Sequence, residues 1–298
     1  MVVCAGQALV DCIVKGGTAS VADSIGIYPG GEAVNEAVTL SRLGTKVILS
    51  AAIGADYAGD IIRKTVVPEG IGTMPGAYPG ATPVSLLTVN PDGSRSSRLS
   101  QAHFLPGYLP ELPDCSLSFV TMASLFRAPF LSPAACKSFA SAAKQKGAKI
   151  IADTKLPKGT DPKLDDYDDF LPLVDYITPN RQEAEYFTRE KDPVTQAEIF
   201  RSKGVKNVII KLDSDGAYIL PEEGEGFIIP AYKVKVADGV GAGDAFIGGL
   251  IHALLMDGSL REAARFATAC AAVSVTAPGA LTAIKNEKQI LNFIKKHN

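Results

Sequence analysis

The 298-residue chain has almost no charge bias. Lysine and arginine number 30 against 32 aspartate and glutamate, so the formal net charge is −2 and the isoelectric point is near 6.0. A nucleic-acid-binding domain is expected to carry a basic stripe or a much higher isoelectric point. The composition therefore predicts no nucleic-acid partner.

Cysteines are few, and no two of them lie close together in the sequence. The five lie far apart, at Cys4, Cys12, Cys115, Cys136 and Cys270, and form no C-x-x-C motif. This spacing argues against a zinc site and against a disulfide framework. Free thiols are typical of a reducing compartment, so we expect a cytoplasmic protein.

A convincing membrane segment is also lacking. The stretch 266–284 has no charged residue, but it is rich in Ala, Ser and Thr and is interrupted by Pro278 and Gly279. A buried helix followed by a turn is therefore expected there. The N-terminus has no basic segment, and Asp11 interrupts its apolar residues, which favours a strand over a signal peptide. We expect no membrane partner.

Three nucleotide-binding signatures are missing. The chain has no Walker A loop of the form G-x-x-x-x-G-K-[ST] and none of the protein-kinase motifs. A dinucleotide-dependent dehydrogenase would need G-x-G-x-x-G after the first strand, where Gly6 stands alone.

Apolar strand-like runs alternate with helical patterns along most of the chain. Strands are expected over 46–53, 149–153, 176–178 and 207–212, and helices over 59–67, 181–188, 195–203, 244–256 and 259–276. Such alternation with short connections predicts an α/β fold, with a mostly parallel central sheet flanked by helices on both faces. Ser259 and Glu262 have the spacing of a capping box at the start of the last helix.

Two segments, about 7–28 and 83–104, depart from this alternation. Each has the pattern of two extended strands joined by a turn, the second at Asn90–Gly93. We expect the two segments to meet in space as a small antiparallel sheet that acts as a lid beside an active site. The chain, 1–298, is then a single α/β domain that carries this lid.

The run Gly241-Ala242-Gly243-Asp244 is the most informative motif. Small residues at a helix N-terminus leave backbone N–H groups open to an anion, which the helix dipole also favours. A carboxylate beside such an anion is useful when it takes a proton from an attacking hydroxyl, as in phosphoryl transfer. On these residues alone, the alternative that Asp244 only caps the helix stays open.

Three further motifs have two interpretations each. Gly30, Gly31 and Asn35 either bring backbone and amide groups against a ligand or form the first turn of a helix. Asp11, near a strand end, either binds sugar hydroxyls or is a turn residue. Asn180 and Glu183 either form a capping box or orient waters around Mg²⁺ on nucleotide phosphates.

Together and in this order, the motifs resemble those of the ribokinase (PfkB) family of carbohydrate kinases over nearly the whole chain. The matching segments are Gly30-Gly31…Asn35, Ile53–Gly59, Asn180…Glu183, Lys211–Gly216 and Asp238–Asp244. The resemblance implies a Rossmann-like α/β body with a β-sheet lid. It also implies an ATP-dependent sugar kinase that phosphorylates a hydroxymethyl group, with frequent homodimers through the lid.

The resemblance assigns roles to individual residues. It implies that Asp244 is the catalytic base, with an anion hole formed by Gly241, Ala242 and Gly243. The sugar site would comprise Asp11, Gly31 and Asn35, and the nucleotide site Asn180, Lys211, Gly216 and Gly243. Glu183 would act near Mg²⁺ through water. Asp238, with Val240 and the loop around Ala277 and Gly279, would bind a monovalent cation such as K⁺.

The chain departs from the family pattern at three places. Gly239 replaces a common Thr, Asp213 replaces a Gly, and Asp153-Thr154-Lys155 stands where Asp-x-Asn is frequent. These changes leave the base and the anion hole intact but affect the K⁺ site and the nucleotide contacts. Lys155 would compensate by meeting a phosphate.

The acceptor is less well determined than the reaction. Fructose is favoured, with ribose, 2-keto-3-deoxygluconate and a nucleoside as alternatives. Arg95 and Arg98 either meet an acidic substrate or are solvated lid residues, and His103 is expected on the lid surface. A non-catalytic sugar- or nucleotide-binding protein of the same fold is the alternative from another functional class.

Overall fold

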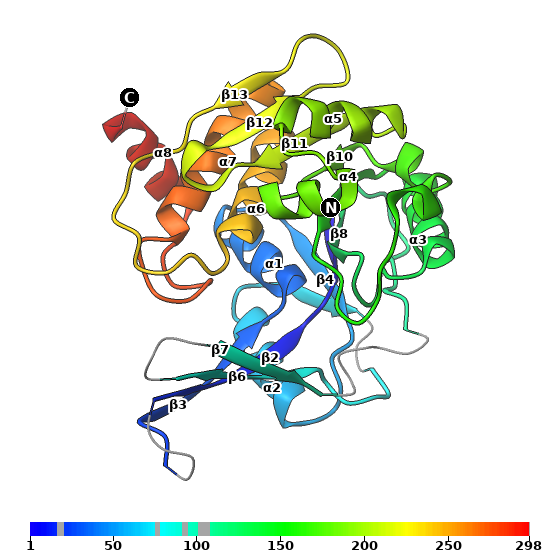
Figure 1. The fold of residues 1–298 in the computed structure, drawn as a ribbon. Helices are drawn as coiled ribbons and strands as arrows, with labels where there is room; N and C mark the ends of the chain where they lie inside the picture. Colours follow the sequence, from blue (N-terminus) through cyan, green and yellow to red (C-terminus); the bar gives the residue numbers. More distant parts are fainter. Residues whose placement is uncertain (17–20, 75–77, 91–94, 101–107, 298) are drawn as a thin grey trace.

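The computed structural model describes residues 1–16, 21–74, 78–90, 95–100 and 108–297 (Figure 1). Its main sheet has nine strands. In spatial order they are β13 (Phe227–Ile229), β12 (Ala217–Leu220), β11 (Asn207–Lys211), β10 (Tyr176–Ile177), β9 (Lys149–Thr154), β8 (Phe119–Leu125), β1 (Val2–Gly6), β4 (Val47–Ala51) and β5 (Gly72–Met74). All neighbours pair in parallel except β11 with β12 and β12 with β13. The predicted mostly parallel sheet is confirmed.

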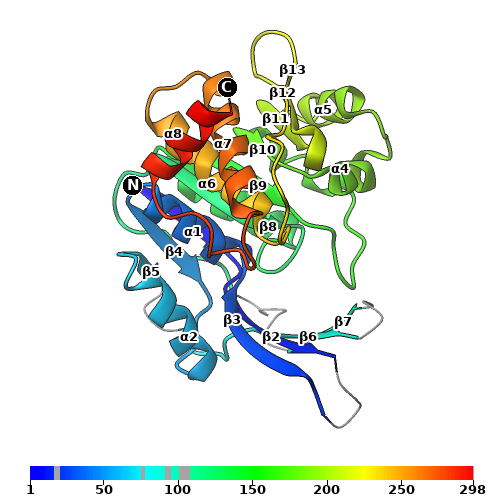
Figure 2. The ribbon, with the colours of Figure 1, turned by 90° about the vertical axis from the view of Figure 1, so that its left-hand side faces the viewer.

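Helices cover both faces of this sheet (Figures 1 and 2). One face carries α1 (Glu32–Arg42), α2 (Tyr57–Val66), α6 (Ala242–Leu255) and α7 (Leu260–Ser274); the other carries α3 (Pro133–Gln145), α4 (Arg181–Thr188) and α5 (Pro193–Ser202). A last helix, α8 (Glu287–Lys296), packs on α7. Strand β1 shows why the sheet is apolar throughout: Val2 and Cys4 enter one core, and Val3 and Ala5 enter the other.

Local sequence explains where the helices begin. Ser259 accepts a hydrogen bond from the Glu262 N–H, and Glu262 accepts one from the Ser259 N–H, so the predicted capping box is present. Asn180 and Glu183 form the same reciprocal pair at the start of α4. Helix α7 ends at Ser274, before Pro278 and Gly279, as the pattern of 266–284 predicted. No helix in the described part of the chain is long and apolar enough to cross a membrane.

A second sheet of four strands lies beside the carboxyl ends of the main strands (Figure 2). Its order is β3 (Ser24–Gly30), β2 (Leu9–Lys15), β6 (Val84–Val89) and β7 (Arg95–Leu99). The β2–β3 and β6–β7 pairs are antiparallel hairpins, and a parallel β2–β6 pairing joins them. The two segments 7–28 and 83–104 therefore meet, although 91–94 and 101–104, which hold most of the predicted turn and His103, lie outside the described residues.

Candidate active site

One cavity of about 1140 Å³ lies between the second sheet and the carboxyl ends of the parallel strands. Single ligands usually occupy about 300–1,000 Å³, so this cavity has room for two. Every predicted site residue except Glu183 lines it: Asp11, Gly31, Asn35, Asn180, Lys211, Gly216, Asp238, Gly241, Ala242, Gly243 and Asp244. Four of the five matching segments, together with Asp11, thus converge on one site, as expected at the carboxyl edge of a parallel sheet, whereas Ile53–Gly59 does not line the cavity.

Asp244 lies in the first turn of α6 and is 5% exposed. Asn35, in α1, donates a hydrogen bond from Nδ2 to Asp244 Oδ2 at 2.7 Å. Burial raises the pKa of Asp244 to about 6, against the opposing effects of the Lys155 ammonium and of the Asn35 hydrogen bond. A carboxylate with a pKa in this range is suited to accept a proton near neutral pH.

The backbone before Asp244 forms an open helix N-terminus. Gly241 is the N-cap, with φ 81°, and no side chain caps the helix there. A Cβ at Gly241 would lie 2.4 Å from the Ala280 Cβ, so only glycine fits this turn against the 280 loop. The first N–H groups of a helix lack intrahelical acceptors and point to where an anion is stabilised.

Lys211 reaches this helix start from the end of β11. Its Nζ lies 2.6 Å from Asp153 Oδ1 and 3.3 Å from where a Cβ on Gly243 would stand. Asp153 is fully buried at the end of β9 and also accepts a hydrogen bond from Thr178 Oγ1 at 3.0 Å. The ammonium is therefore placed beside the turn of backbone amides, where it would stabilise a phosphate.

Glu183 is held by its own helix start. Its Oε2 accepts hydrogen bonds from the Thr154 hydroxyl and from the Asn180 N–H, both at 2.9 Å. Nearby, Asp153 Oδ2 is buried without a hydrogen-bond partner among the described residues. Those residues form no group of three or more His, Cys, Asp or Glu ligands. The site therefore fits Mg²⁺ held by one or two carboxylates together with phosphate oxygens and water, and not an all-protein cage.

Lys155, at the end of β9, forms a second ion pair within the cavity. Its Nζ lies 3.5 Å from Glu32 Oε1, while Glu32 Oε2 accepts a hydrogen bond from Ser124 Oγ at 2.7 Å. Burial opposes the charge of Lys155, yet Glu32 and Asp153 outweigh it and raise the Lys155 pKa. Burial likewise opposes ionisation of Glu32, yet the Lys155 ammonium and the Ser124 hydrogen bond lower its pKa.

The predicted sugar-binding residues lie at the junction of the two sheets. Burial raises the pKa of Asp11, on β2, and Ser85, on the neighbouring β6, partly offsets this. Gly31 has φ 98°, and a Cβ there would lie 2.4 Å from the Gln7 carbonyl oxygen. A side chain would therefore push α1 away from the segment that joins β1 to β2, the strand of Asp11.

Asp238 joins two loops at the other end of the cavity. Its Oδ1 accepts a hydrogen bond from the Val240 N–H at 3.0 Å, and its Oδ2 accepts one from the Gly279 N–H at 2.9 Å. The segments predicted to hold a monovalent cation are thus brought together. The carboxylate itself is engaged by backbone amides.

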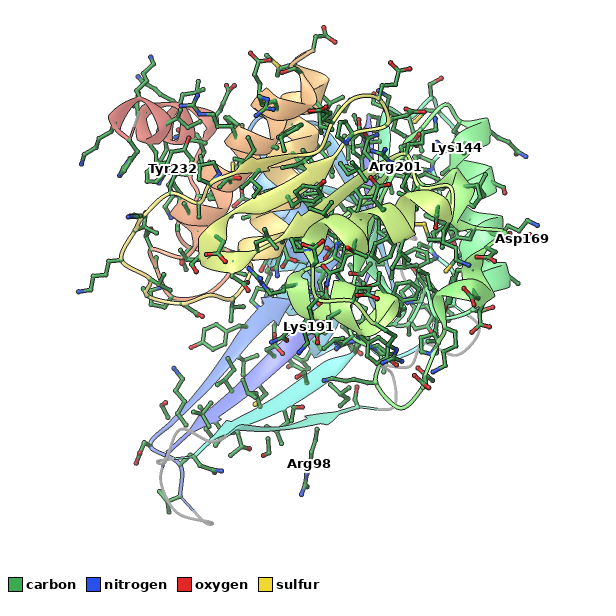
Figure 3. All side chains as sticks on the ribbon, turned by 45° about the horizontal axis from the view of Figure 1, so that its top comes forward. Arg98, Lys144, Asp169, Lys191, Arg201 and Tyr232 are labelled. Atoms are coloured by element: carbon green, nitrogen blue, oxygen red, sulfur yellow. The ribbon has the colours of Figure 1, made fainter. Side chains whose placement is uncertain are left out.

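The two arginines of the second sheet, Arg95 and Arg98, are only partly described. Arg98 pairs with Leu86, whereas their chain neighbours Ser85 and Leu99 line the cavity. Successive side chains of a strand alternate between faces, so Arg98 lies on the far face, and Figure 3 shows it pointing away from the body. The side chain of Arg95 and all of His103 lie outside the described part.

Sequence reasoning missed four cavity or near-cavity residues. Glu32 lies inside the Gly30–Asn35 motif, and this position in the sequence could have identified it as a site residue. Glu36 follows the same motif and is fully buried. Arg127 follows β8, a strand that the sequence pattern did not single out, and Lys158 follows the recognised Asp153–Lys155 segment. Only the tertiary structure brings the last two together.

The pfkB family carbohydrate kinase model matches residues 1–287. The chain is 30% identical over 273 residues to a ribokinase of Haemophilus influenzae, covering 89% of this chain and 87% of the relative. It is 28% identical over 286 residues to an aminoimidazole riboside kinase of Salmonella typhimurium, covering 91% and 89%.

Two solved structures extend this similarity to three dimensions. A Salmonella enterica aminoimidazole riboside kinase, determined with aminoimidazole riboside and an ATP analogue, has a TM-score of 0.78 at 26% identity and covers 98% of this chain and 99% of its own. A candidate ribokinase II of E. coli, determined with ATP and Mg²⁺, has a TM-score of 0.82 at 25% identity, with 99% of both chains covered. The chain therefore belongs to the pfkB family of carbohydrate kinases, which confirms the resemblance of its motifs.

Proposed function

We propose that this kinase transfers the γ-phosphate of ATP to a hydroxymethyl group of a sugar, with Asp244 as the general base. The observation that carries the proposal is the position of the buried Asp244 carboxylate: it stands in the first turn of α6 and is held there by Asn35. A hydroxyl that hydrogen-bonds to Asp244 then lies next to the amides that would bind the phosphate.

The chain supplies positioning, a proton acceptor and charge stabilisation. Asn35 holds Oδ2 of Asp244, which leaves Oδ1 to take the proton of the attacking hydroxyl. The amides at Gly241, Ala242 and Gly243, with the Lys211 ammonium, stabilise the charge on the transferring phosphoryl group. Asp153 and Glu183 would hold Mg²⁺ together with phosphate oxygens and water, and the metal would supply charge neutralisation on the nucleotide phosphates.

We propose a five- or six-carbon sugar as acceptor, bound by Asp11, Gly31 and Asn35 beneath the second sheet. Closure of this sheet would exclude water, which otherwise competes as acceptor. Ribose and fructose are the first sugars to test, because relatives of similar length are described as ribokinases and fructokinases. A riboside is tested beside them because of the Salmonella relative.

A coupled ADP-release assay tests the proposal. The panel comprises ribose, fructose, 2-keto-3-deoxygluconate and nucleosides, each with Mg²⁺ and ATP, with and without K⁺. We expect ADP release that depends on one acceptor class and is lost in Asp244→Asn. ATP hydrolysis that does not depend on an acceptor, or no ADP release across the panel, would contradict the proposed acceptor class.

The same assay tests the cation site near Asp238. Stimulation by K⁺ would support this site, and equal rates in Na⁺ and K⁺ would contradict it.

We also propose a homodimer formed through the lid. Ile25 and Ile27 on β3 are 66% and 58% exposed, and Leu86 lies in line with Ile27 on the same face, away from the cavity. The apolar row on an edge strand is suited to a second copy of the chain. Light scattering should give a dimer mass for the wild type and a monomer mass for Ile27→Lys; a wild-type monomer would contradict the proposal.

A cytoplasmic location is proposed from the thiols. All five cysteines are free, and Cys4, Cys136 and Cys270 are buried. Unpaired thiols persist in a reducing compartment.

A further inference from the structure

The charged side chains of the cavity form a row along the carboxyl ends of β11, β9 and β8. Lys211 pairs with Asp153 at 2.6 Å, and Lys155 pairs with Glu32 at 3.5 Å. Each of these cations therefore has a carboxylate partner of its own. From Lys211 through Asp153 and Lys155 to Glu32, positive and negative side chains alternate along the row.

The alternation ends at Arg127 and Lys158, which both line the cavity. Among the described residues, neither forms an ion pair within 4.0 Å with a carboxylate. The charge of Glu32 interacts with both cations, but its two oxygens are already engaged by Lys155 and Ser124. Burial, and then the neighbouring Arg127 charge, lower the pKa of Lys158. Two adjacent cations at the wall of a cavity leave an excess of positive charge there.

Arg127 is tied to the segment that carries Lys158. Arg127 Nε donates to the Leu156 carbonyl oxygen at 2.6 Å, and the Lys155 N–H donates to the Leu125 carbonyl oxygen at 2.9 Å. The segments that follow β8 and β9 are thereby tied to each other. The bond through Nε orients the guanidinium and leaves its terminal N–H groups for a ligand.

The cations lie at the acceptor end of the cavity and not at the nucleotide end. Glu32 and Asn35 are three residues apart in α1, which places them on one face and about 4.5 Å apart along the axis. Asn35 contacts Asp244, whereas Glu32 lies toward Arg127 and Lys158. A sugar whose hydroxyl meets Asp244 would therefore reach the two cations with its other end.

We infer that the acceptor carries an anionic group, a carboxylate or a phosphate, at the end remote from the hydroxyl that is phosphorylated, and that Arg127 and Lys158 bind it. The inference rests on the proposed kinase reaction and names the substrate class for it: a sugar acid or a sugar phosphate. The terminal N–H groups of Arg127 match two oxygens of either anion, and Lys158 adds a second charge.

Matched acceptors test the inference. 2-Keto-3-deoxygluconate is compared with 3-deoxyfructose, which has a hydroxymethyl group in place of the carboxylate, and fructose 1-phosphate is compared with fructose. We expect kcat/KM to be about tenfold to a hundredfold higher for the anion of at least one pair, the range of one charge-assisted hydrogen bond. The pair that responds tells a carboxylate from a phosphate site. A preference for the neutral member in both pairs would overturn the inference.

Charge-removing variants locate the effect. Lys158→Gln changes an exposed side chain and leaves the fold intact, and Arg127→Gln tests the second cation; Lys137→Gln on α3, 51% exposed, is the matched control. We expect either cavity variant to lower kcat/KM for the preferred anion about tenfold or more and to leave kcat/KM for the neutral acceptor unchanged. The control variant should change kcat/KM for neither acceptor. An equal loss for both acceptors, or a rise in KM for ATP, would assign the cations to the nucleotide and overturn the inference.

A binding measurement separates this inference from the proposed reaction. Asp244→Asn retains Arg127 and Lys158, so calorimetry on that variant reports acceptor affinity without turnover. Affinity for 2-keto-3-deoxygluconate or fructose 1-phosphate that falls on adding Lys158→Gln supports the anion site even if the wild type releases no ADP. Affinity that does not change on adding Lys158→Gln, for either anion, would overturn it.

Discussion

Asn35 and Asp244 lie 209 residues apart in the chain, and the Asn35 amide donates to the Asp244 carboxylate at 2.7 Å. The bond links the first turn of α6 to α1, the helix that follows strand β3 of the second sheet. It fixes one oxygen of the proposed base and partly offsets the rise in pKa that burial causes. This hydrogen bond therefore joins the motif proposed to bind the sugar to the motif proposed to bind the phosphate.

Replacing the base should abolish turnover without abolishing binding. Asp244→Asn keeps the size of the side chain but cannot accept the proton, so we expect kcat to fall by at least about two orders of magnitude. Steady-state kinetics with the best acceptor checks this, and calorimetry checks that acceptor affinity changes little. Near wild-type turnover in a folded Asp244→Asn protein would rule out the assignment.

The pH dependence of kcat/KM should report the Asp244 ionisation. The base must be deprotonated, and burial raises its pKa to about 6, so activity should rise through about pH 6 and level off above it. Lys155 lowers this pKa, so Lys155→Gln should move the rising limb to higher pH. Profiles measured from pH 5 to 9 test both statements. A limb that stays in place in Lys155→Gln would contradict the coupling.

Two glycines of the α6 start should respond differently to alanine. In Gly241→Ala an alanine would have to adopt φ 81°, and its Cβ would lie 2.4 Å from the Ala280 Cβ. We therefore expect a loss of about 2 kcal/mol or more in the free energy of unfolding. Gly243 lies inside the helix, and a Cβ there meets only the flexible end of Lys211 at 3.3 Å. Gly243→Ala should therefore keep stability within about 0.5 kcal/mol.

The same pair separates folding from phosphate binding. If the amide of Gly243 meets the transferring phosphate, a methyl group beside it should lower kcat/KM for ATP about tenfold or more, because one preorganised donor contributes at least this much. Urea unfolding and ATP kinetics on both variants provide the comparison. Full activity in Gly243→Ala would place the phosphate elsewhere.

Glu36 should act as a neutral buried acid. Its carboxyl group is fully buried, and neither oxygen has a hydrogen-bond partner among the described residues. Burial, then the nearby Asp153, raises its pKa well above the usual range. A raised carboxyl pKa contributes stability that is present at low pH and is lost as the pH rises through the folded value.

Urea unfolding at pH 6 and pH 9 tests this expectation. Glu36→Gln cannot ionise, so it should be at least as stable as the wild type at pH 9 and should lose less stability between the two pH values. Asp165→Asn, at an exposed surface ion pair with Lys203, is the control. An equal loss in Glu36→Gln and in the wild type would show that Glu36 is already ionised in the folded state at pH 6 and would contradict the expectation.

Local sequence determined much of this protein because its signals are short-range. Hydrophobic periodicity predicted the α/β alternation. Side-chain spacing predicted the capping box at Ser259 and offered one as an alternative at Asn180, each with a partner three residues away. The small residues before Asp244 predicted an open helix N-terminus for the same reason. The order of these motifs pointed to the family, which the comparisons confirmed.

Only the tertiary structure decided which charges are neighbours. Lys155 pairs with Glu32 across more than a hundred residues. The charges of Arg127 and Lys158 act on each other because β8 and β9 are adjacent and end at the same edge. Nothing in the spacing along the chain specifies such contacts, since strand order and register are set by packing of both sheet faces. The sequence alone therefore predicted the phosphate end of the proposed reaction, while the folded chain placed the charges that we propose select the acceptor.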